Sequence, residues 1–359
     1  MKKLLIIRKQ QFGYHTDIYK WCQYLNDKYK IDLVCFDEGQ RKFVMNNVNV
    51  HYVSKCGSKK IRGLHYILCC IYYVLFFKGI VIVSYFHGCH YIKKILPWKK
   101  MVLDIRTFNV SSDESVRMRM NKVIMKTVEL YDFVTIISEG LRSQLPKDKS
   151  LTALLPLGGD IIDTGKKDYE SIDLLYVGTF QNRKIEKTIE GFAIAKKQMG
   201  ERIHYHIIGK GFKGEDEQLK SLSERLGVAE NINFYGYLPH DKLLDFYHKC
   251  NVGVSFIPIT SYFDYQPPTK TFEYIMAGLY TIATATYSNK EVITSDNGIL
   301  INDTSDDFAD GILRIAKLND LDGDKIRNSL NQYQWSSIVN GRMVPILEHV
   351  EQLFGYIND

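Results

Sequence analysis

Short apolar runs alternate with segments of helical periodicity along the whole chain. In the first half this pattern predicts strands at 4–8, 32–36, 80–85, 100–105, 133–137 and 151–155. In the second half it predicts strands at 174–177, 204–208, 232–235, 252–256, 280–283 and 299–301. Strands separated by helices are typical of parallel sheets covered on both faces, so we expect two α/β domains that are doubly wound and Rossmann-like.

Gly158-Gly159 and the polar run 163–170 indicate where the first domain ends. We therefore expect an N-terminal domain over 1–165, a second domain over 166–335, and a C-terminal helix over 336–359 that packs back toward the first domain; the family resemblance described below implies that the first domain binds the acceptor and the second the donor. Open α/β sheets bind ligands at the carboxyl ends of their strands. The chemistry is expected in a cleft across which the two domains face each other.

One apolar segment, residues 63–86, has Lys78 as its only formal charge and approaches the length that a bilayer requires. Lys78-Gly79 divides it, because helical spacing precedes this pair and the β-branched run 80–83 follows it. The segment is predicted to be a helix, a tight turn and a strand. The helix is apolar all round, so we expect it to be buried, either in the domain or in a membrane interface.

Charge is divided unevenly between the halves. Residues 1–165 carry 26 Lys and Arg against 14 Asp and Glu, whereas residues 166–359 carry 21 against 27. Between residues 39 and 103 there is no acidic residue, but there are eleven Lys or Arg. This run suggests an anionic partner such as an anionic membrane surface, a phosphorylated acceptor or nucleic acid, and a plain solvated face is the alternative. Nucleic acid is disfavoured because no helix-turn-helix, zinc or RNA-binding motif accompanies the charge.

Seven cysteines without a C-x-x-C pair are typical of reduced, buried thiols. The apolar run near the start, residues 4–7, is too short for a secretion signal. We expect a cytoplasmic protein that is peripheral on the inner face of the cytoplasmic membrane.

The stretch YFDYQPPTKTFEYIMAGLYTIAT, residues 262–284, predicts a short helix over 270–277 with Thr269 as its N-cap. A helix N-terminus that follows a strand is an anion site. Lys270 and Glu273 share one face, where the lysine can hold a diphosphate and the carboxylate can accept both hydroxyls of a ribose. A surface ion pair is the alternative.

Arg183 and Lys184 follow the first strand of the second half, where doubly wound sheets meet nucleotide phosphates. Two adjacent cations there suit a pyrophosphate, and a solvated loop is the alternative. Gly178 and Gly209 end strands and allow backbone to approach a ligand.

Four segments in this order, LLYVGTFQNRKIEKTIEGFAIA, YHIIGKG, NINFYGYLPHDKLLDFYHKCNVGVSF and PPTKTFEYIMAGLYTIAT, closely resemble the donor-binding half of glycosyltransferase family 4. These are retaining enzymes of the GT-B fold that use nucleotide sugars. In the first half, VLDIRT, YDFVTIISEGLRSQL and LPLGGDIID resemble the same family more weakly. The resemblance implies that Glu273 binds the donor ribose and that Arg183 and Lys184 neutralise the leaving diphosphate. It also implies donor contacts by Tyr235, Gly236 and Tyr237 against the base and by Thr269, Lys270 and Thr271 at the phosphates.

Two departures from the family pattern stand out. The family has a first glutamate eight residues before the second, where this chain has Tyr265 with Asp264 beside it. Many members also have a histidine where this chain reads Asp104-x-Arg106, which can act on substrate or form a structural pair. His87 is a further cleft candidate, although a lone histidine is more often structural. Gly13 and His15 resemble the acceptor-side loop.

The resemblance implies a retaining glycosyltransferase that moves a sugar from a nucleotide diphosphate sugar to a lipid-linked or polysaccharide acceptor in surface glycan biosynthesis. No cofactor is expected beyond this co-substrate. No metal is expected either, because the D-x-D pattern at Asp322 is predicted to lie in a late polar turn. The alternatives are a sugar-nucleotide epimerase or hydrolase of the same fold, and a non-catalytic sugar-nucleotide-binding protein at the membrane.

Overall fold

The computed structural model describes residues 1–146, 149, 151–212, 214–239 and 242–355. The chain divides into two compact units, Met1–Gly158 with Trp335–Asp359 (unit 1) and Gly159–Gln334 (unit 2). The boundary predicted from the sequence lies at 165/166. The segment after Gly158 instead groups with unit 2, where Ile162 N donates to Met276 O at 3.0 Å and Thr164 Oγ1 donates to Ala277 O at 2.8 Å.

Unit 1 is built on a seven-stranded parallel sheet in the order β3-β2-β1-β4-β5-β6-β7. The strands are β1 (Lys2–Ile7), β2 (Tyr29–Phe36), β3 (Val48–Val53), β4 (Ile80–Ser84), β5 (Val102–Ile105), β6 (Phe133–Ile136) and β7 (Thr152–Leu154). The central strand β4 is buried along its whole length, as its β-branched run predicts. The strand β3 was not predicted; it is an edge strand that is only partly buried.

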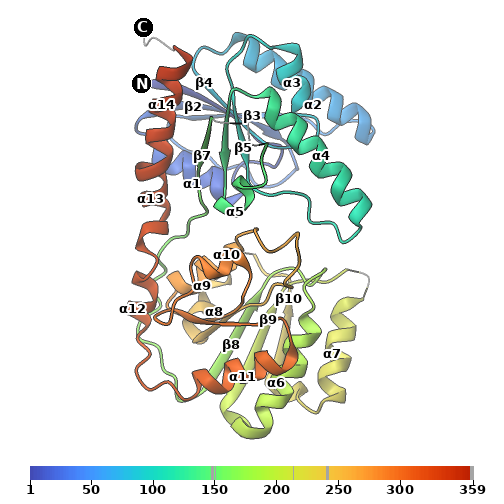
Figure 1. Cartoon of the computed structure of the whole chain (residues 1–359), viewed down its shortest axis with the longest axis vertical. Helices are drawn as coiled ribbons and strands as arrows, with labels where there is room; N and C mark the ends of the chain where they lie inside the picture. The colour runs from blue at the N-terminus through green and yellow to red at the C-terminus, as the bar shows by residue number, and fades with distance from the viewer. Residues whose placement is uncertain (147–148, 150, 213, 240–241, 356–359) are drawn as a thin grey trace. The chain divides into compact units, whose positions relative to one another are not determined.

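Helices flank this sheet in Figure 1. They are α1 (Thr16–Leu25), α2 (Lys59–Phe76), α3 (His90–Ile95), α4 (Glu114–Leu130), α5 (Glu139–Arg142), α13 (Trp335–Ile338) and α14 (Val344–Phe354). The last two return from unit 2 and are joined by a π-helical turn, Val339–Met343. Lys2 Nζ lies 2.5 Å from Glu351 Oε2, and Lys28 Nζ donates to Asn340 Oδ1 at 3.1 Å, so both ends of the chain pack within unit 1.

The apolar segment 63–86 forms the predicted helix, turn and strand. Helix α2 ends at Phe76 and β4 begins at Ile80. The helix is not buried all round: Tyr66, Cys70 and Val74 are buried. The opposite face exposes a stripe of large apolar side chains, which we call the α2 stripe: Ile61, Leu64, Leu68, Tyr72, Leu75 and Phe76. In the described part of the chain, no helix has both the length and the hydropathy to cross a membrane.

Unit 2 is built on a six-stranded parallel sheet in the order β10-β9-β8-β11-β12-β13. Its strands are β8 (Ile172–Val177), β9 (Ile203–Ile208), β10 (Ile232–Gly236), β11 (Val252–Ser255), β12 (Tyr280–Thr284) and β13 (Gly298–Ile301). The strand order reverses between β8 and β11, which is where doubly wound sheets bind ligands.

The helices of unit 2 are α6 (Ile185–Met199), α7 (Glu215–Arg225), α8 (Leu244–Lys249), α9 (Thr269–Met276), α10 (Tyr287–Lys290), α11 (Ser305–Ile315) and α12 (Gly323–Asn328). Helices α6 and α11 lie side by side (Figure 1), and they approach so closely that a Cβ on Gly191 would lie 2.4 Å from Ser305 O. Unit 2 begins and ends at neighbouring points, because Gly159 N donates to Tyr333 O at 3.0 Å.

Candidate functional site

Glycines end the two strands on one side of the point where the strand order reverses. Gly178 follows β8 with φ +151°, and Gly209 follows β9 with φ +153°. The backbone approach is so close that a Cβ on Gly209 would lie 1.8 Å from Gly178 O. The N–H of Gly209 donates to Gly236 O at 2.8 Å, which links two predicted site residues through their backbone.

Helix α9 begins at Thr269, and Pro268 is its N-cap. The expectation that Thr269 is the N-cap is therefore wrong: the extended backbone of Pro268 ends there, and Thr269 is already helical. Proline has no side-chain acceptor, and no side chain caps this end. Thr271 is buried, with its Oγ1 at 2.7 Å from Ser255 Oγ and donating to Asn289 Oδ1 at 3.1 Å. It anchors the first turn of the helix to β11 and α10.

Lys270 points from this first turn toward the end of β8. Its ammonium nitrogen lies 3.7 Å from the centroid of the Tyr176 ring, and it would lie 3.2 Å from a Cβ on Gly178. The nitrogen is shielded from solvent and makes no hydrogen bond within the described residues. Burial, followed by the positive charge of Arg183, holds the pKa of Lys270 well below its usual range, and Glu273 opposes this only in part.

Tyr274 couples α9 to β8, because its hydroxyl oxygen accepts a hydrogen bond from Val177 N at 2.7 Å. One turn of helix separates it from Lys270, so this bond fixes how the lysine meets the strand end. Glu273 is partly buried beside it, and its Oε2 accepts a hydrogen bond from Tyr247 Oη at 3.4 Å. The carboxylate is therefore positioned by the protein.

The two cations after β8 diverge. The Arg183 guanidinium lies 4.2 Å from the centroid of the Phe263 ring, and burial lowers its pKa. Lys184 has a left-handed backbone, φ +53°, and precedes α6. Its half-exposed ammonium lies 3.7 Å from Asp303 Oδ2. Arg183 is therefore near enough for its charge to lower the pKa of Lys270, whereas the Lys184 ammonium is directed toward Asp303.

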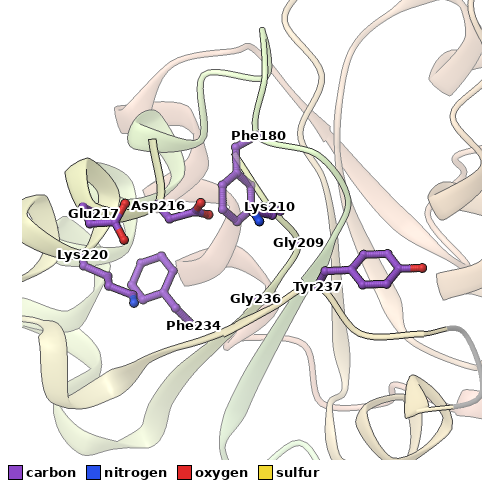
Figure 2. Close-up of a pocket in the computed structure, with 9 residues that line it drawn as sticks. All are labelled: Phe180, Gly209, Lys210, Asp216, Glu217, Lys220, Phe234, Gly236 and Tyr237. Carbon is purple, nitrogen blue, oxygen red and sulfur yellow. The ribbon is translucent and has the colours of Figure 1, made fainter. Parts of the chain in front are cut away.

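A cavity of about 290 Å³ lies beside these strand ends (Figure 2). Its lining comprises Phe180, Gly209, Lys210, Asp216, Glu217, Lys220, Phe234, Gly236 and Tyr237. It includes three predicted donor contacts, although Figure 2 shows the Tyr237 side chain pointing away from the rings of Phe180 and Phe234. Tyr235 is not in the lining: its hydroxyl lies 2.9 Å from His206 Nδ1, and its ring packs 4.7 Å from that of Phe246.

Asp264 and Tyr265 both contact the start of α10. Asp264 Oδ1 accepts a hydrogen bond from Tyr287 N at 2.7 Å, and the Tyr265 ring lies 5.0 Å from that of Tyr287. One carboxylate oxygen of Asp264 therefore fixes the loop that contains Asp264 to the start of α10.

In unit 1, Arg106 pairs closely with Asp17 and more distantly with Asp104. Its Nε donates to Asp17 Oδ2 at 2.6 Å and its Nη1 donates to Leu155 O at 2.6 Å, whereas Asp104 Oδ1 is 3.8 Å away. Asp104 is fully buried and accepts from Thr135 Oγ1 at 2.9 Å, and burial raises its pKa. Asp104 and Arg106 thus belong to a buried polar network.

The other predicted residues of unit 1 lie in loops. Gly13 has φ +93°, and a Cβ there would lie 2.2 Å from the Phe43 ring. His15 precedes α1, and its Nδ1 is shielded without a hydrogen-bond partner in the described part. Burial, helped by the positive charge of Arg8, lowers the pKa of His15 to about 4, so its imidazole is neutral at physiological pH. His87 is exposed beyond the end of β4.

Several contacts escaped the sequence analysis. The rings of Tyr176 and Phe263, which lie against the two cations, are ordinary core aromatics in the sequence. Phe180 and Lys210 in the cavity carry no motif of their own. Arg8 had a usable signal, because it directly follows the first strand of unit 1, as Arg183 lies in the loop after the first strand of unit 2.

The D-x-D pattern does not lie in a turn. Asp322 is the N-cap of α12, and its Oδ1 accepts from Asp324 N at 2.8 Å, because an aspartate satisfies the free N–H groups of a first helical turn. Across the described residues, no cluster of three or more His, Cys, Asp or Glu side chains is arranged to hold a metal ion.

Comparison with known proteins places this geometry in context. Residues 160–334 match the family model "Glycosyl transferases group 1". No curated protein matches the chain. Sucrose-phosphate synthase from Thermosynechococcus elongatus has a similar structure, with a TM-score of 0.74 at 15% identity over 99% of this chain and 100% of that one.

Two further solved structures are similar. For the lipopolysaccharide outer core galactosyltransferase WaaB the TM-score is 0.71 at 14% identity, over 97% of this chain and 99% of that one. For HepE of Anabaena, in complex with UDP and glucose, it is 0.70 at 13% identity, over 99% and 100%. The chain therefore has the GT-B fold of these glycosyltransferase structures, and its second unit matches the glycosyl transferases group 1 family.

Proposed function

We propose that the chain is a glycosyltransferase of family 4, which transfers a sugar with retention from a nucleotide diphosphate sugar to a lipid-linked or polysaccharide acceptor in surface glycan biosynthesis. The observation that carries the proposal is the buried ammonium of Lys270, unpartnered within the described chain. A buried ammonium without a hydrogen-bond partner is costly for the free protein, and an anionic ligand removes that cost. It lies in the segment that matches the group 1 family.

The donor diphosphate binds at the first turn of α9, next to Lys270 and Arg183. Helix N–H groups without a side-chain cap and two desolvated cations together make a strong anion site. Glu273 accepts the ribose hydroxyls, and the cavity beside Gly209 and Gly236 receives the base. Lys184 contributes charge at longer range, because its ammonium is directed toward Asp303.

Negative charge grows on the diphosphate as the bond to the sugar breaks. Lys270 and Arg183 stabilise this charge most in the transition state, because they are shielded from water and already positioned. The leaving diphosphate takes the proton of the acceptor hydroxyl, which attacks the same face of the sugar. This route uses no pair of protein carboxylates, and its two cations perform the charge neutralisation for which other enzymes use a metal.

The acceptor side of the proposal concerns unit 1 and an anionic membrane. The α2 stripe exposes six large apolar side chains, and Tyr91, Ile95 and Trp98 are exposed on and after α3, which packs against α2. The acid-free run 39–103 supplies the basic residues around them. An apolar helix face with flanking Lys and Arg is suited to the anionic inner face of the cytoplasmic membrane, where a lipid-linked acceptor is held.

The test combines binding and turnover. Thermal unfolding is measured with UDP, GDP, ADP and their sugars, with magnesium and with a chelator, and UDP-glucose is the first donor because HepE is seen with UDP and glucose. We expect one nucleotide to raise Tm in either condition, and we expect its release from the donor sugar only when an acceptor is added.

The alternatives give different results. A sugar nucleotide that is altered or hydrolysed without acceptor would indicate an epimerase or hydrolase. Donor binding without turnover on any membrane or polysaccharide acceptor would indicate a binding protein. No stabilisation by any nucleotide would contradict the donor site itself.

A further inference from the structure

A second cavity, of about 330 Å³, lies in unit 1 and is lined by residues that follow four adjacent strands. Arg8 and Lys9 follow β1, Phe36 ends β2, Lys55 follows β3, and Tyr85 follows β4. These strands are neighbours in the order β3-β2-β1-β4, so the cavity lies along the carboxyl edge of the sheet. That edge is where open α/β sheets bind ligands.

The cavity is positively charged. Three cations, Arg8, Lys9 and Lys55, line it against one carboxylate, Glu38, which lies 2.5 Å from Lys55 Nζ. Arg8 is held in orientation, because its Nη2 donates to Gln10 Oε1 at 2.6 Å and its Nη1 donates to Ser84 Oγ at 2.5 Å. A preorganised guanidinium of this kind is the group that proteins use for phosphate oxygens.

Two groups in the lining have no hydrogen-bond partner within the described chain. The Lys9 ammonium has no hydrogen-bond or ion-pair partner among these residues and lies 5.9 Å from the centroid of the Phe36 ring. The Tyr85 hydroxyl is shielded from solvent and likewise unpartnered. Burial, followed by the charges of Lys59 and Lys55, lowers the pKa of Lys9. An anion between these groups would satisfy the hydroxyl and relieve the repulsion among the lysines.

We propose that this cavity binds the phosphate group of a phosphate ester, with Arg8 and Lys9 as charge partners and Tyr85 as a hydrogen-bond donor. The inference rests on the proposed function, since it identifies the acceptor as a phosphorylated molecule. Phe36 and Phe86 supply the apolar part of the lining, against which the organic part of the ester packs.

The ester has two possible sources, a lipid headgroup and a soluble phosphorylated sugar. The position of Lys59 favours the lipid. Lys59 is close enough to Lys9 to lower its pKa, and it is the first residue of α2. The α2 stripe begins two residues later, at Ile61, so a hydrocarbon tail that leaves the cavity can follow an apolar surface.

Calorimetric titration of the full chain with decyl phosphate, inorganic phosphate and decanol tests the site, with UDP present so that the nucleotide site is occupied. We expect decyl phosphate to bind and decanol not to bind. Lys9→Gln should lower the affinity for decyl phosphate by about tenfold, as expected for a lost charge-assisted hydrogen bond. Tyr85→Phe should lower this affinity by about threefold. Lys122→Gln, at an exposed position on α4, carries the same charge change and should bind like the wild type.

The outcomes separate the sources and the two proposals. Tighter binding of decyl phosphate than of inorganic phosphate supports the lipid source, and equal binding supports a soluble ester. Binding of neither, or equal binding by Lys9→Gln and the wild type, overturns the site even if UDP binds and sugar is transferred. Absence of UDP binding in a separate titration instead counts against the proposed function, while the phosphate result stands by itself.

Discussion

The ammonium nitrogen of Lys270 lies 3.7 Å from the centroid of the Tyr176 ring, and within the described residues it has no hydrogen-bond partner. A cation–π contact offsets part of the cost of removing this charge from water, but it supplies no acceptor for the three N–H bonds. Folding therefore leaves the Lys270 ammonium without an acceptor, and the diphosphate of the proposed donor would supply one.

Replacing Lys270 by methionine should separate stability from binding. Methionine keeps an unbranched side chain against the Tyr176 ring and removes the buried charge, so the ligand-free protein should gain Tm, by about 2–4 °C for each kcal/mol of desolvation relieved. The rise in Tm caused by UDP should disappear. Lys317→Met, at an exposed position, is the matched control and should leave both quantities unchanged. A Lys270→Met protein that is less stable and still responds to UDP would contradict this account.

Donor binding should be coupled to proton uptake. The pKa of Lys270 is lowered in the free protein, and a bound diphosphate raises it again because it stabilises the charged form. Between these two pKa values binding therefore takes up a proton, and affinity falls as pH rises. Titration calorimetry with UDP in two buffers of different ionisation enthalpy measures the proton. We expect Lys270→Met to abolish it; unchanged uptake in that variant would assign the proton to another group.

Glu273→Gln should lower the affinity for UDP by about five- to tenfold, because a neutral amide is a poorer acceptor for the ribose hydroxyls than a carboxylate. The informative comparison is 2′,3′-dideoxy-UDP, which lacks these hydroxyls and should bind equally to wild type and variant. Tyr247→Phe removes the 3.4 Å hydrogen bond to Glu273 and should have a smaller effect. An equal loss for both ligands in Glu273→Gln would mean that the carboxylate acts on some other part of the donor.

Gly209→Ala should disrupt the end of β9 more than backbone strain alone requires. Both Gly209 and Gly227 have positive φ, so alanine costs about 1–2 kcal/mol at either position. Only at Gly209 would the new Cβ also collide with backbone, 1.8 Å from Gly178 O, whereas nothing lies within 4 Å at Gly227. The Tm of Gly209→Ala should therefore be lower than that of Gly227→Ala, and only Gly209→Ala should lose UDP binding. Equal Tm values would show that the strand ends can separate at little cost.

The α2 stripe should bind anionic lipid. Co-sedimentation with phosphatidylcholine vesicles should increase as phosphatidylglycerol is added and decrease with salt, because the attraction is worth about 1 kcal/mol per basic residue near the surface. Leu68→Asp, on the stripe, should reduce binding. Val44→Asp introduces the same charge at a position that is 97% exposed but lies outside α2, and this variant should bind vesicles like the wild type. Indifference of the wild type to lipid charge and to salt would make the basic run an ordinary solvated face.

Much of the fold was accessible from the sequence because parallel strands buried on both faces are continuous apolar runs. The missed strand, β3, lies at a sheet edge where Asn49 and His51 interrupt the run. For α2 the pattern established the helix but not its buried face, since apolar residues occur all round it. Which residues of α2 are buried, here Tyr66, Cys70 and Val74, depends on the side chains of the sheet against which the helix packs.

Candidate site residues could be identified where position along the chain determines position in the sheet. Lys270 and Glu273 lie on the helix that comes after β11, Arg183 lies in the loop after β8, and Lys270 packs against the end of β8. Long-range pairings were not accessible: Arg106 finds Asp17, 89 residues earlier, and Lys184 turns toward Asp303 because of a left-handed backbone. Such contacts depend on the fold as a whole, and no local pattern contains them.

The hydrogen bond between Gly159 N and Tyr333 O has a consequence for the history and the engineering of this chain. Because the first and last residues of unit 2 are adjacent, the whole unit can be regarded as an insertion at one point of unit 1, between β7 and α13. A segment whose ends meet can be excised, exchanged with that of a relative or circularly permuted without stretching its backbone. Unit 2, which we propose to bind the nucleotide, is in this sense an exchangeable segment. If that proposal holds, replacing unit 2 with that of a relative should change the donor while unit 1 is retained.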